Sequence, residues 1–410
     1  MAVAGSNLAV RPILLLKSFI VAKYLGPADY GLFKTIELIQ MLNKYGNLGF
    51  RQTANREVGD LIGKKSTANV GLVKNTLYSS ELILSLILFF IGTSISLFFD
   101  DKSISIMIIV ASFGLLASKI RGILNTEAVI QKNFILHSKV AFITTLIASI
   151  TIIVTVPYLK IYAMLLTNII VGVIAIGCYL KYLNFKFSFI IAKKEFKRLF
   201  KISISLTVPT LALGLFKYTE RILVIIFLGP LALGFYSFGE MISAQISTIF
   251  KLPIKVRMQD IYEGLGAGEY LKIHKMVVKE TTILTLLTIA IIPIAWYLLQ
   301  LFIPIFLSNW VDGIVYAQIF LFVMPFHIIP NYIVNVLLSS LVNKQFIVSI
   351  FQFIGSLILA IHTFSMYTLN ILTIERFIIF DILAIAFYSI SLIILYKIYF
   401  FNVFVTKKIY

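Results

Sequence analysis

The chain has 410 residues, of which 60% are hydrophobic and only 13% charged, and its mean hydropathy is +0.97. A soluble domain carries roughly 25% charged residues, so this composition predicts a membrane protein without a separate soluble domain. The formal net charge is +18. Such a charge can indicate nucleic-acid binding, but the positions of the basic residues along this chain indicate otherwise. The one cysteine, Cys178, excludes an internal disulfide and a multi-thiolate metal site.

Twelve apolar runs are long enough to cross a membrane, which takes roughly twenty apolar residues per helix. The first is interpreted as a retained helix, because the N-terminal residues contain no small-residue cleavage site after a short apolar core. The expected fold class is an all-α polytopic membrane protein. The expected spans are about 7–25, 28–49, 71–99, 104–123, 140–157, 161–181, 203–228, 231–251, 281–304, 314–340, 346–366 and 377–396.

The phrase at the first helix junction is repeated 203 residues later. VAKYLGPADYGLFKTIELI at 21–39 and VIIFLGPLALGFYSFGEMI at 224–242 agree at seven of nineteen positions. In each copy an apolar run stops at Leu-Gly-Pro and a second run follows at once, which predicts a tight hairpin between two membrane helices. The residues that define the hairpin motif are Gly26, Pro27, Gly31, Gly229, Pro230 and Gly234.

The repeat predicts two related lobes of six helices. Because six is even, the second lobe enters the membrane in the same direction as the first, and the two repeats are parallel about a central cavity. The expected domains are an N-terminal lobe at 1–182, a basic cytoplasmic connector at 183–202 and a C-terminal lobe at 203–410.

Loop charge predicts the orientation. The loops after even-numbered spans, with the C-terminal tail, hold 25 of the 36 Lys and Arg residues, whereas the loops after odd-numbered spans hold very few. Basic loops stay on the cytoplasmic side, so both termini are expected there. The net charge is thus interpreted as a topology signal and an attraction to anionic membrane lipids, and nucleic acid is not an expected partner.

The segment 181–201 is the longest stretch that mixes basic and aromatic residues. Its end, KKEFKRLFK, suits a helix at the headgroups with Phe196, Leu199 and Phe200 turned inward. The preferred interpretation is a connector held by ordinary interfacial forces, and the alternative is a specific contact with lipid headgroups.

Ionisable residues inside the expected spans gather on the repeated helices. Such residues are costly in a membrane and generally face a polar interior. The basic members Lys17, Lys34, Lys217 and Arg221 are the expected ligands of an anionic head group, because cations at membrane depth, Arg above all, hold phosphate oxygens well. Other interpretations remain open, since Glu220 lies one turn from Lys217 and can pair with it.

Three acidic residues on these helices are candidates for coupling or gating. Glu37 and Glu240 occupy equivalent places in the repeat, and either they pair within their own halves or at least one titrates or binds a cation during transport. Lys34 lies three residues before Glu37 and can pair with it. Glu220 aligns with Lys17, so a bridge between them can form in one conformation and break in another.

The motifs together resemble the Wzx-like oligosaccharide-lipid flippases of the MATE-like (MOP) superfamily. The resemblance covers essentially the whole chain and implies export of an undecaprenyl-pyrophosphate-linked oligosaccharide by alternating access for surface polysaccharide synthesis. It also implies the bacterial cytoplasmic membrane, coupling to protons or sodium ions, and a glycan polymerase as a partner. The matching residues are Leu25, Gly26, Pro27, Asp29, Tyr30, Gly31, Leu32, Pro209, Glu220, Arg221, Leu228, Gly229, Gly234, Phe235, Tyr236 and Ser237.

Two other functions stay open at this point: an ion-coupled MATE-like exporter of small molecules, and a non-transporting scaffold of a glycan-assembly complex. The excess of basic over acidic residues on the repeated helices disfavours an exporter of cations. An enzyme is not expected, because the chain has no phosphate-binding glycine loop with lysine and no nucleophile elbow, and neither a metal nor a cofactor is expected.

Overall fold

The computed structural model describes residues 2–45, 47–63, 69–251, 261, 264–265, 267–338, 342 and 344–405. Within these residues the regular structure is helical and includes no strand, which confirms the all-α fold class. Eight of the described helices are long and apolar enough to cross a membrane, or nine if a bent pair counts as one span. Each of the twelve expected spans coincides at least in part with a described helix.

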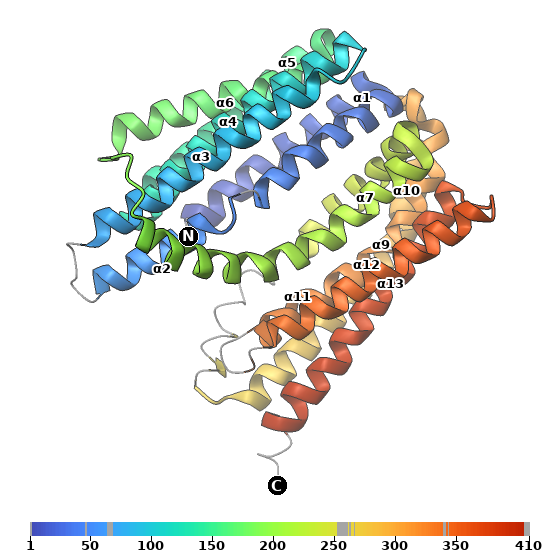
Figure 1. The fold of residues 1–410 in the computed structure, drawn as a ribbon. Coiled ribbons are helices and arrows are strands. Elements are labelled where there is room, and N and C mark those ends of the chain that lie inside the picture. The colour runs from blue at the N-terminus through green and yellow to red at the C-terminus, as the bar shows by residue number, and fades with distance from the viewer. Residues whose placement is uncertain are drawn as a thin grey trace. The chain divides into compact units, whose positions relative to one another are not determined.

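The described residues up to 182 include the helices α1 to α6 (Figure 1). Within this part α4 packs on α6 and α3, and α5 packs on α6. The short α2 covers residues expected to form a loop. Its sequence mixes apolar and polar residues, and the helix is too short to span a bilayer. The helices are α1 (Ala2–Tyr45), α2 (Phe50–Gly63), α3 (Val70–Ser96), α4 (Lys102–Ile130), α5 (Phe134–Leu159) and α6 (Ile161–Tyr182).

The second part begins with the 58-residue α7. In this part α9 packs on α10 and α11, and α13 packs on α10, α11 and α12. The expected span 314–340 is broken, with a bend of 40° between Ser308–Leu321 and Met324–Leu337, next to Pro325 in the sequence. The helices are α7 (Lys193–Phe250), α9 (Tyr270–Phe306), a 3-10 helix (Ser308–Gly313), α10 (Ile314–Leu321), α11 (Met324–Leu338), α12 (Gln345–Thr368), α13 (Ile374–Tyr396) and a π-helix (Lys397–Val405).

Polar side chains fix where several of these helices begin. The side chain of Asp101 accepts a hydrogen bond from the backbone N–H of Ser103 at the start of α4. Asn133 does the same for α5 and Thr373 for α13. Such caps satisfy backbone donors that have no partner inside the helix, so these helix starts are encoded locally in the sequence.

Two compact units divide the chain. One comprises Met1–Leu25 and Thr35–Thr210, and the other comprises Gly26–Lys34 and Leu211–Tyr410. We call them the N-unit and the C-unit. The short stretch Gly26–Lys34 thus belongs to the C-unit although it comes from the first helix. The lobe boundaries expected at 182 and 202 stay a prediction.

Gly229 folds α7 back on itself. Its backbone has φ 83° and ψ −179°, a conformation open almost only to glycine. Arg221 and Glu240 contact each other directly, although nineteen residues of straight helix would separate them by about 28 Å. The α7 sequence is therefore a hairpin. Gly26 has the same type of backbone conformation in α1, with φ 68° and ψ 174°.

The second glycines of the repeated phrase lie where the two copies meet inside the C-unit. A Cβ atom at Gly31 would collide with the carbonyl oxygen of Pro230, and one at Gly234 would collide with the carbonyl oxygen of Pro27. The contact is reciprocal, because each glycine lies against the proline of the other copy. The repeated phrase therefore encodes a close approach of two backbones as well as a turn.

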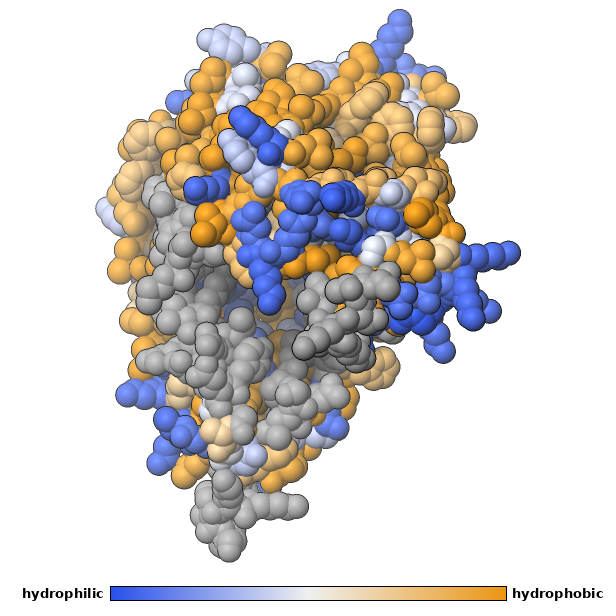
Figure 2. Space-filling view, turned by 90° about the vertical axis from the view of Figure 1, so that its left-hand side faces the viewer, coloured by the Kyte–Doolittle hydropathy of each residue, from blue (hydrophilic) through white to orange (hydrophobic). Residues whose placement is uncertain are grey.

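The exposed surface of the helices is largely apolar, as a lipid-facing surface requires. Large side chains such as Phe90, Ile150 and Leu286 are 57% to 62% exposed. On the face shown in Figure 2, apolar side chains cover much of the described surface and hydrophilic ones gather in groups. Buried apolar clusters hold each unit together, one around Leu77 and Leu199 in the N-unit and others around Tyr236 and Tyr332 in the C-unit.

Candidate functional site

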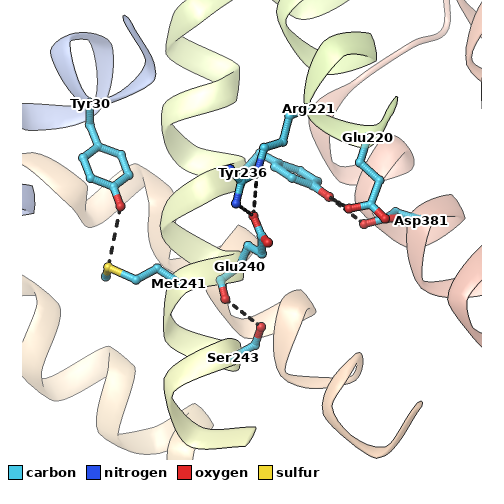
Figure 3. Close-up of polar contacts among 8 residues, drawn as sticks. All are labelled: Tyr30, Glu220, Arg221, Tyr236, Glu240, Met241, Ser243 and Asp381. Atoms are coloured by element: carbon cyan, nitrogen blue, oxygen red, sulfur yellow. Dashed lines mark hydrogen bonds and ion pairs between the residues drawn. The ribbon is translucent and has the colours of Figure 1, made fainter. Parts of the chain in front are cut away.

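The α7 hairpin gathers charged residues in the C-unit. Glu220 and Arg221 lie on its first arm, Tyr236 and Glu240 lie on its second arm, and Asp381 comes from α13 (Figure 3). Glu220, Arg221 and Asp381 are 6%, 8% and 1% exposed. Because buried charge is expensive, each of these groups requires a partner, and the partners are found within the cluster.

Arg221 and Glu240 form an ion pair across the hairpin. The Nε and Nη2 atoms of Arg221 both donate to Oε2 of Glu240, at 3.0 and 2.7 Å. Both side chains are largely buried, with 10% and 13% of their surface exposed. The pair holds the two arms together and neutralises the guanidinium in this conformation.

The Tyr236 hydroxyl lies between two carboxyl groups. Its oxygen is 2.9 Å from Oε2 of Glu220 and 2.8 Å from Oδ2 of Asp381. A phenol has one hydrogen to donate, and an ionised carboxylate only accepts. The arrangement is therefore best satisfied when one of the two carboxyl groups carries a proton and donates it to the tyrosine oxygen.

A cavity of about 240 Å³ adjoins this cluster. Two buried oxygens of its wall, Oδ1 of Asp381 and Oε1 of Gln352, have no hydrogen-bond partner among the described residues. The wall carries three acidic residues and one lysine, so the described pocket is rich in carboxylates. Its polar lining residues are Glu220, Tyr236, Glu240, Ser243, Lys251, His327, Asn331, Gln352, Asp381 and Tyr388.

The expected anion ligands lie in different places. Lys17 is half-buried in the N-unit, as is the coupling candidate Glu37. Lys34 belongs to the C-unit, where its Nζ lies 5.3 Å from the ring centre of Tyr30 and 5.4 Å from that of Phe33. The side chain of Lys217 lies outside the described part of the chain, so its expected pairing with Glu220 stays a prediction.

Sequence reasoning did not assign a role to Tyr236 or Asp381. Tyr236 entered only as part of a family motif, and Asp381 lies in the last expected span, away from the repeated helices. A single acidic residue inside a span is itself a signal of a polar interior. Its partners come from a helix 145 residues earlier, and one sequence does not reveal that pairing.

A second buried ionic network lies in the N-unit. Arg51 donates to Oε1 of Glu81 through Nε at 2.7 Å and to the Lys119 carbonyl at 3.2 Å. Glu127 accepts from Lys74 at 2.8 Å, from the Tyr78 hydroxyl at 3.0 Å and from Gln131 at 2.8 Å. The network links α2, α3 and α4. Among the described residues, no group of three or more His, Cys, Asp or Glu is arranged to hold a metal ion.

Comparison with known proteins agrees with a transporter fold. A family model described as polysaccharide biosynthesis protein matches residues 20–315. An inward-facing multidrug resistance MATE transporter of the MOP superfamily has a similar structure, with a TM-score of 0.65, 12% identity and coverage of 96% of this chain and 99% of that one. A eukaryotic MATE transporter gives a TM-score of 0.64, with 15% identity and coverage of 97% and 94%.

A MOP superfamily transporter from Pyrococcus furiosus matches with a TM-score of 0.59, 13% identity and coverage of 97% and 93%. At these identities the likeness shows the fold alone. No curated protein matched this chain by sequence.

Proposed function

Because this chain belongs to the polysaccharide biosynthesis protein family, we propose that it is a flippase that moves an undecaprenyl-pyrophosphate-linked oligosaccharide across the bacterial cytoplasmic membrane. The MATE-like fold supports transport, and the family supports a glycan-related substrate. A lipid-linked oligosaccharide meets both conditions, because such a substrate is made on one side of a membrane and used on the other.

Our proposal for ion coupling rests on the position of the Tyr236 hydroxyl between Glu220 and Asp381. Two ionised carboxylates cannot both receive the one phenolic hydrogen, and their mutual repulsion in a buried site favours a bound proton. We therefore infer that this cluster binds and releases a proton during each transport cycle, and that the coupling ion is the proton rather than sodium. Asp381, whose Oδ1 has no hydrogen-bond partner among the described residues, also lines the cavity, which gives a proton a route to the cluster.

Arg221 connects the proton site to the substrate. In the present conformation its guanidinium is occupied by Glu240. When Glu240 is protonated the pair weakens, and Arg221 gains free donors for a phosphate oxygen. Lys17, Lys34 and Lys217 complete the proposed set of pyrophosphate ligands. The Glu240 carboxylate and a substrate phosphate would then compete for one arginine, so a proton bound at Glu240 would favour substrate binding at Arg221.

The test uses the purified full chain in vesicles with a fluorescent undecaprenyl-pyrophosphate-linked oligosaccharide, whose exposed fraction is read with a membrane-impermeant quencher. We expect the wild-type protein to move the probe faster under a pH gradient than under an equal sodium gradient. Asp381→Asn and Glu220→Gln should reduce the rate to that measured without a gradient. Glu269→Gln is the matched control, because Glu269 is an exposed carboxylate whose ion pair, within the described part of the chain, is with nearby Lys272.

The outcomes separate the parts of the proposal. Movement of the probe driven by sodium alone would overturn the proton site and leave the flippase. Full gradient dependence in both Asp381→Asn and Glu220→Gln would show that the cluster is structural. No movement of the probe under any gradient would reject the flippase and favour a non-transporting scaffold, unless the alternative cargo below is moved.

One observation favours a second candidate, an exporter of organic cations. Glu220, Glu240 and Asp381 all line the described cavity, opposed there by one lysine, and carboxylates suit cationic cargo. The same vesicles loaded with ethidium test it. Ethidium export that fails in Asp381→Asn, without any movement of the lipid probe, would establish this second function instead.

A further inference from the structure

The segment between α6 and α7 is fixed to the N-unit. Residues 184–192 form neither helix nor strand, yet three backbone N–H groups donate to side chains of α3: Ser188 to Asn75, Ile190 to Ser79 and Ala192 to Thr76, at 3.4, 3.1 and 3.4 Å. The carbonyl of Asn184 accepts a hydrogen bond from the side chain of Gln131, the residue after α4, at 2.9 Å. These bonds hold residues 184–197 against the helices. We call this segment, which includes the first turn of α7, the strap.

The strap exposes three consecutive apolar side chains. Phe189, Ile190 and Ile191 are 64%, 43% and 39% exposed. The backbone N–H of Ile190 donates to Ser79 of α3, so the backbone of this stretch is bonded to the protein. The three exposed side chains project into the surroundings. A fixed apolar projection of this kind implies an apolar medium outside the protein.

Cations surround the apolar projection. Lys186, Lys193, Lys194 and Lys197 are exposed, and none forms an ion pair among the described residues. The one acidic residue of the strap, Glu195, pairs instead with Arg198, which also contacts Glu57 at 2.6 Å. The hydrogen bond to Glu57 raises the pKa of Arg198, so this residue stays charged and keeps both carboxylates occupied. Four lysine charges therefore remain for a partner.

We propose that the strap is a binding surface for anionic phospholipids, with Phe189, Ile190 and Ile191 inserted at the boundary of the acyl chains and the four lysines on the phosphates. Apolar side chains beside uncompensated lysines are the pattern of interfacial membrane contacts. The strap begins just after the membrane helix α6 ends at Tyr182, where headgroups lie. Tyr182 itself is 63% exposed, with the Lys181 ammonium 5.3 Å from its ring centre.

We assign this surface to lipid rather than to a protein or a nucleic acid. The exposed apolar side chains and the lysines need an apolar and an anionic partner at once, and a bilayer interface offers both. Figure 2 views the molecule from the side on which the strap lies in Figure 1, and hydrophilic side chains gather there beside apolar ones. With basic loops on the cytoplasmic side, the lipids are those of the inner leaflet. The contact is independent of what the protein transports.

The test measures the melting temperature of the purified, delipidated full chain in neutral detergent while dioleoylphosphatidylglycerol is titrated in. We expect this lipid to raise the melting temperature, and dioleoylphosphatidylcholine or inorganic phosphate to raise it much less. In the variant K186Q/K193Q/K194Q/K197Q the apparent affinity for phosphatidylglycerol should fall by about tenfold or more. The matched control is K102Q/K275Q/K279Q/K397Q, which removes the same number of exposed lysines elsewhere.

Two further variants keep the proposal testable. Replacing the four strap lysines by arginine should restore the affinity, and Phe189→Ser with Ile191→Ser should weaken it while leaving every charge in place. An equal loss in the matched control would show a general charge effect and overturn the surface. An unchanged affinity in the strap variant, or an equal response to inorganic phosphate alone, would overturn it as well.

Discussion

Two glycines of each repeated phrase have separate physical roles. Gly26 and Gly229 adopt backbone conformations that side chains resist, and a Cβ atom there would meet nothing within 4 Å. At Gly31 and Gly234 another backbone lies against the glycine, so a side chain would not fit there. The spacing Gly-Pro-x-x-x-Gly thus encodes a turn first and a close contact one helical turn later.

Alanine at these positions should destabilise the protein for two different reasons. Gly26→Ala and Gly229→Ala should each cost about 1–3 kcal/mol through backbone strain, and Gly31→Ala and Gly234→Ala a similar amount through collision with a proline carbonyl. Melting temperatures of the purified variants in detergent measure the loss. Gly177→Ala is the control, because Gly177 lies inside a helix with open space around it, and it should leave stability unchanged or raise it by up to about 1 kcal/mol. Equal stability of all five variants would contradict this account.

At this scale the sequence predicted the motif residues and most of the charged ones. Arg221, Glu220 and Glu240 were identified from their depth in the spans, and the structure brings Arg221 and Glu240 together. Tyr236 and Asp381 could not be assigned, since a tyrosine in a span is ordinary and the distance between them along the chain is large. One described pocket of the C-unit is lined by three acidic residues and one lysine, whereas the sequence showed an excess of basic residues on the repeated helices.

Among the elements, the helices of the N-unit are joined by charge as well as by apolar packing. Glu81 and Glu127 are each 1% exposed, and the hydrogen bonds of Glu127 come from Lys74 and Tyr78 of α3 and from Gln131 at the end of its own helix. Removing one partner of a buried ion pair leaves an uncompensated charge, which is strongly destabilising.

Glu127→Ala should therefore lower stability by about 3–5 kcal/mol. Glu127→Gln keeps an acceptor for Tyr78 and should be less harmful. The exposed pair of Glu269 and Lys272 serves as the comparison, and Glu269→Ala should change stability by about 1 kcal/mol or less. Melting temperatures of the three variants, measured side by side in one detergent, check this order. If Glu127→Ala behaved like Glu269→Ala, the network would not hold these helices together.

Element existence was more predictable than element ends. Apolar runs of about twenty residues found the spans, but α9 begins at Tyr270, eleven residues before the expected start at 281. The reason is that Lys272, Lys275 and Lys279 were read as loop, whereas charged residues extend a helix readily beyond the membrane. The short α2 was missed for a similar reason, because a search for apolar runs ignores amphipathic helices.

For the molecule as a whole, the charge distribution predicts that both termini and all basic loops lie in the cytoplasm. Single cysteines test this in a Cys178→Ala background, which removes the one native thiol. Lys197→Cys should react with an impermeant maleimide only after the membrane is opened, and Lys102→Cys should react in intact cells. Both positions are exposed, so a difference in labelling reports sidedness. Labelling of both from the same side would overturn the predicted topology.

The division into units has a consequence for how such a protein can be recombined. Nine residues of the first half, Gly26–Lys34, belong to the C-unit, where Gly31 lies against Pro230. Consider a chimaera made from the first half of one related protein and the second half of another. Its C-unit would contain residues 26–34 from the first protein and residues 211–410 from the second. A working exchange would have to carry these nine residues along with 211–410. The repeated phrase is therefore the part of the first half that has to stay matched to the second half.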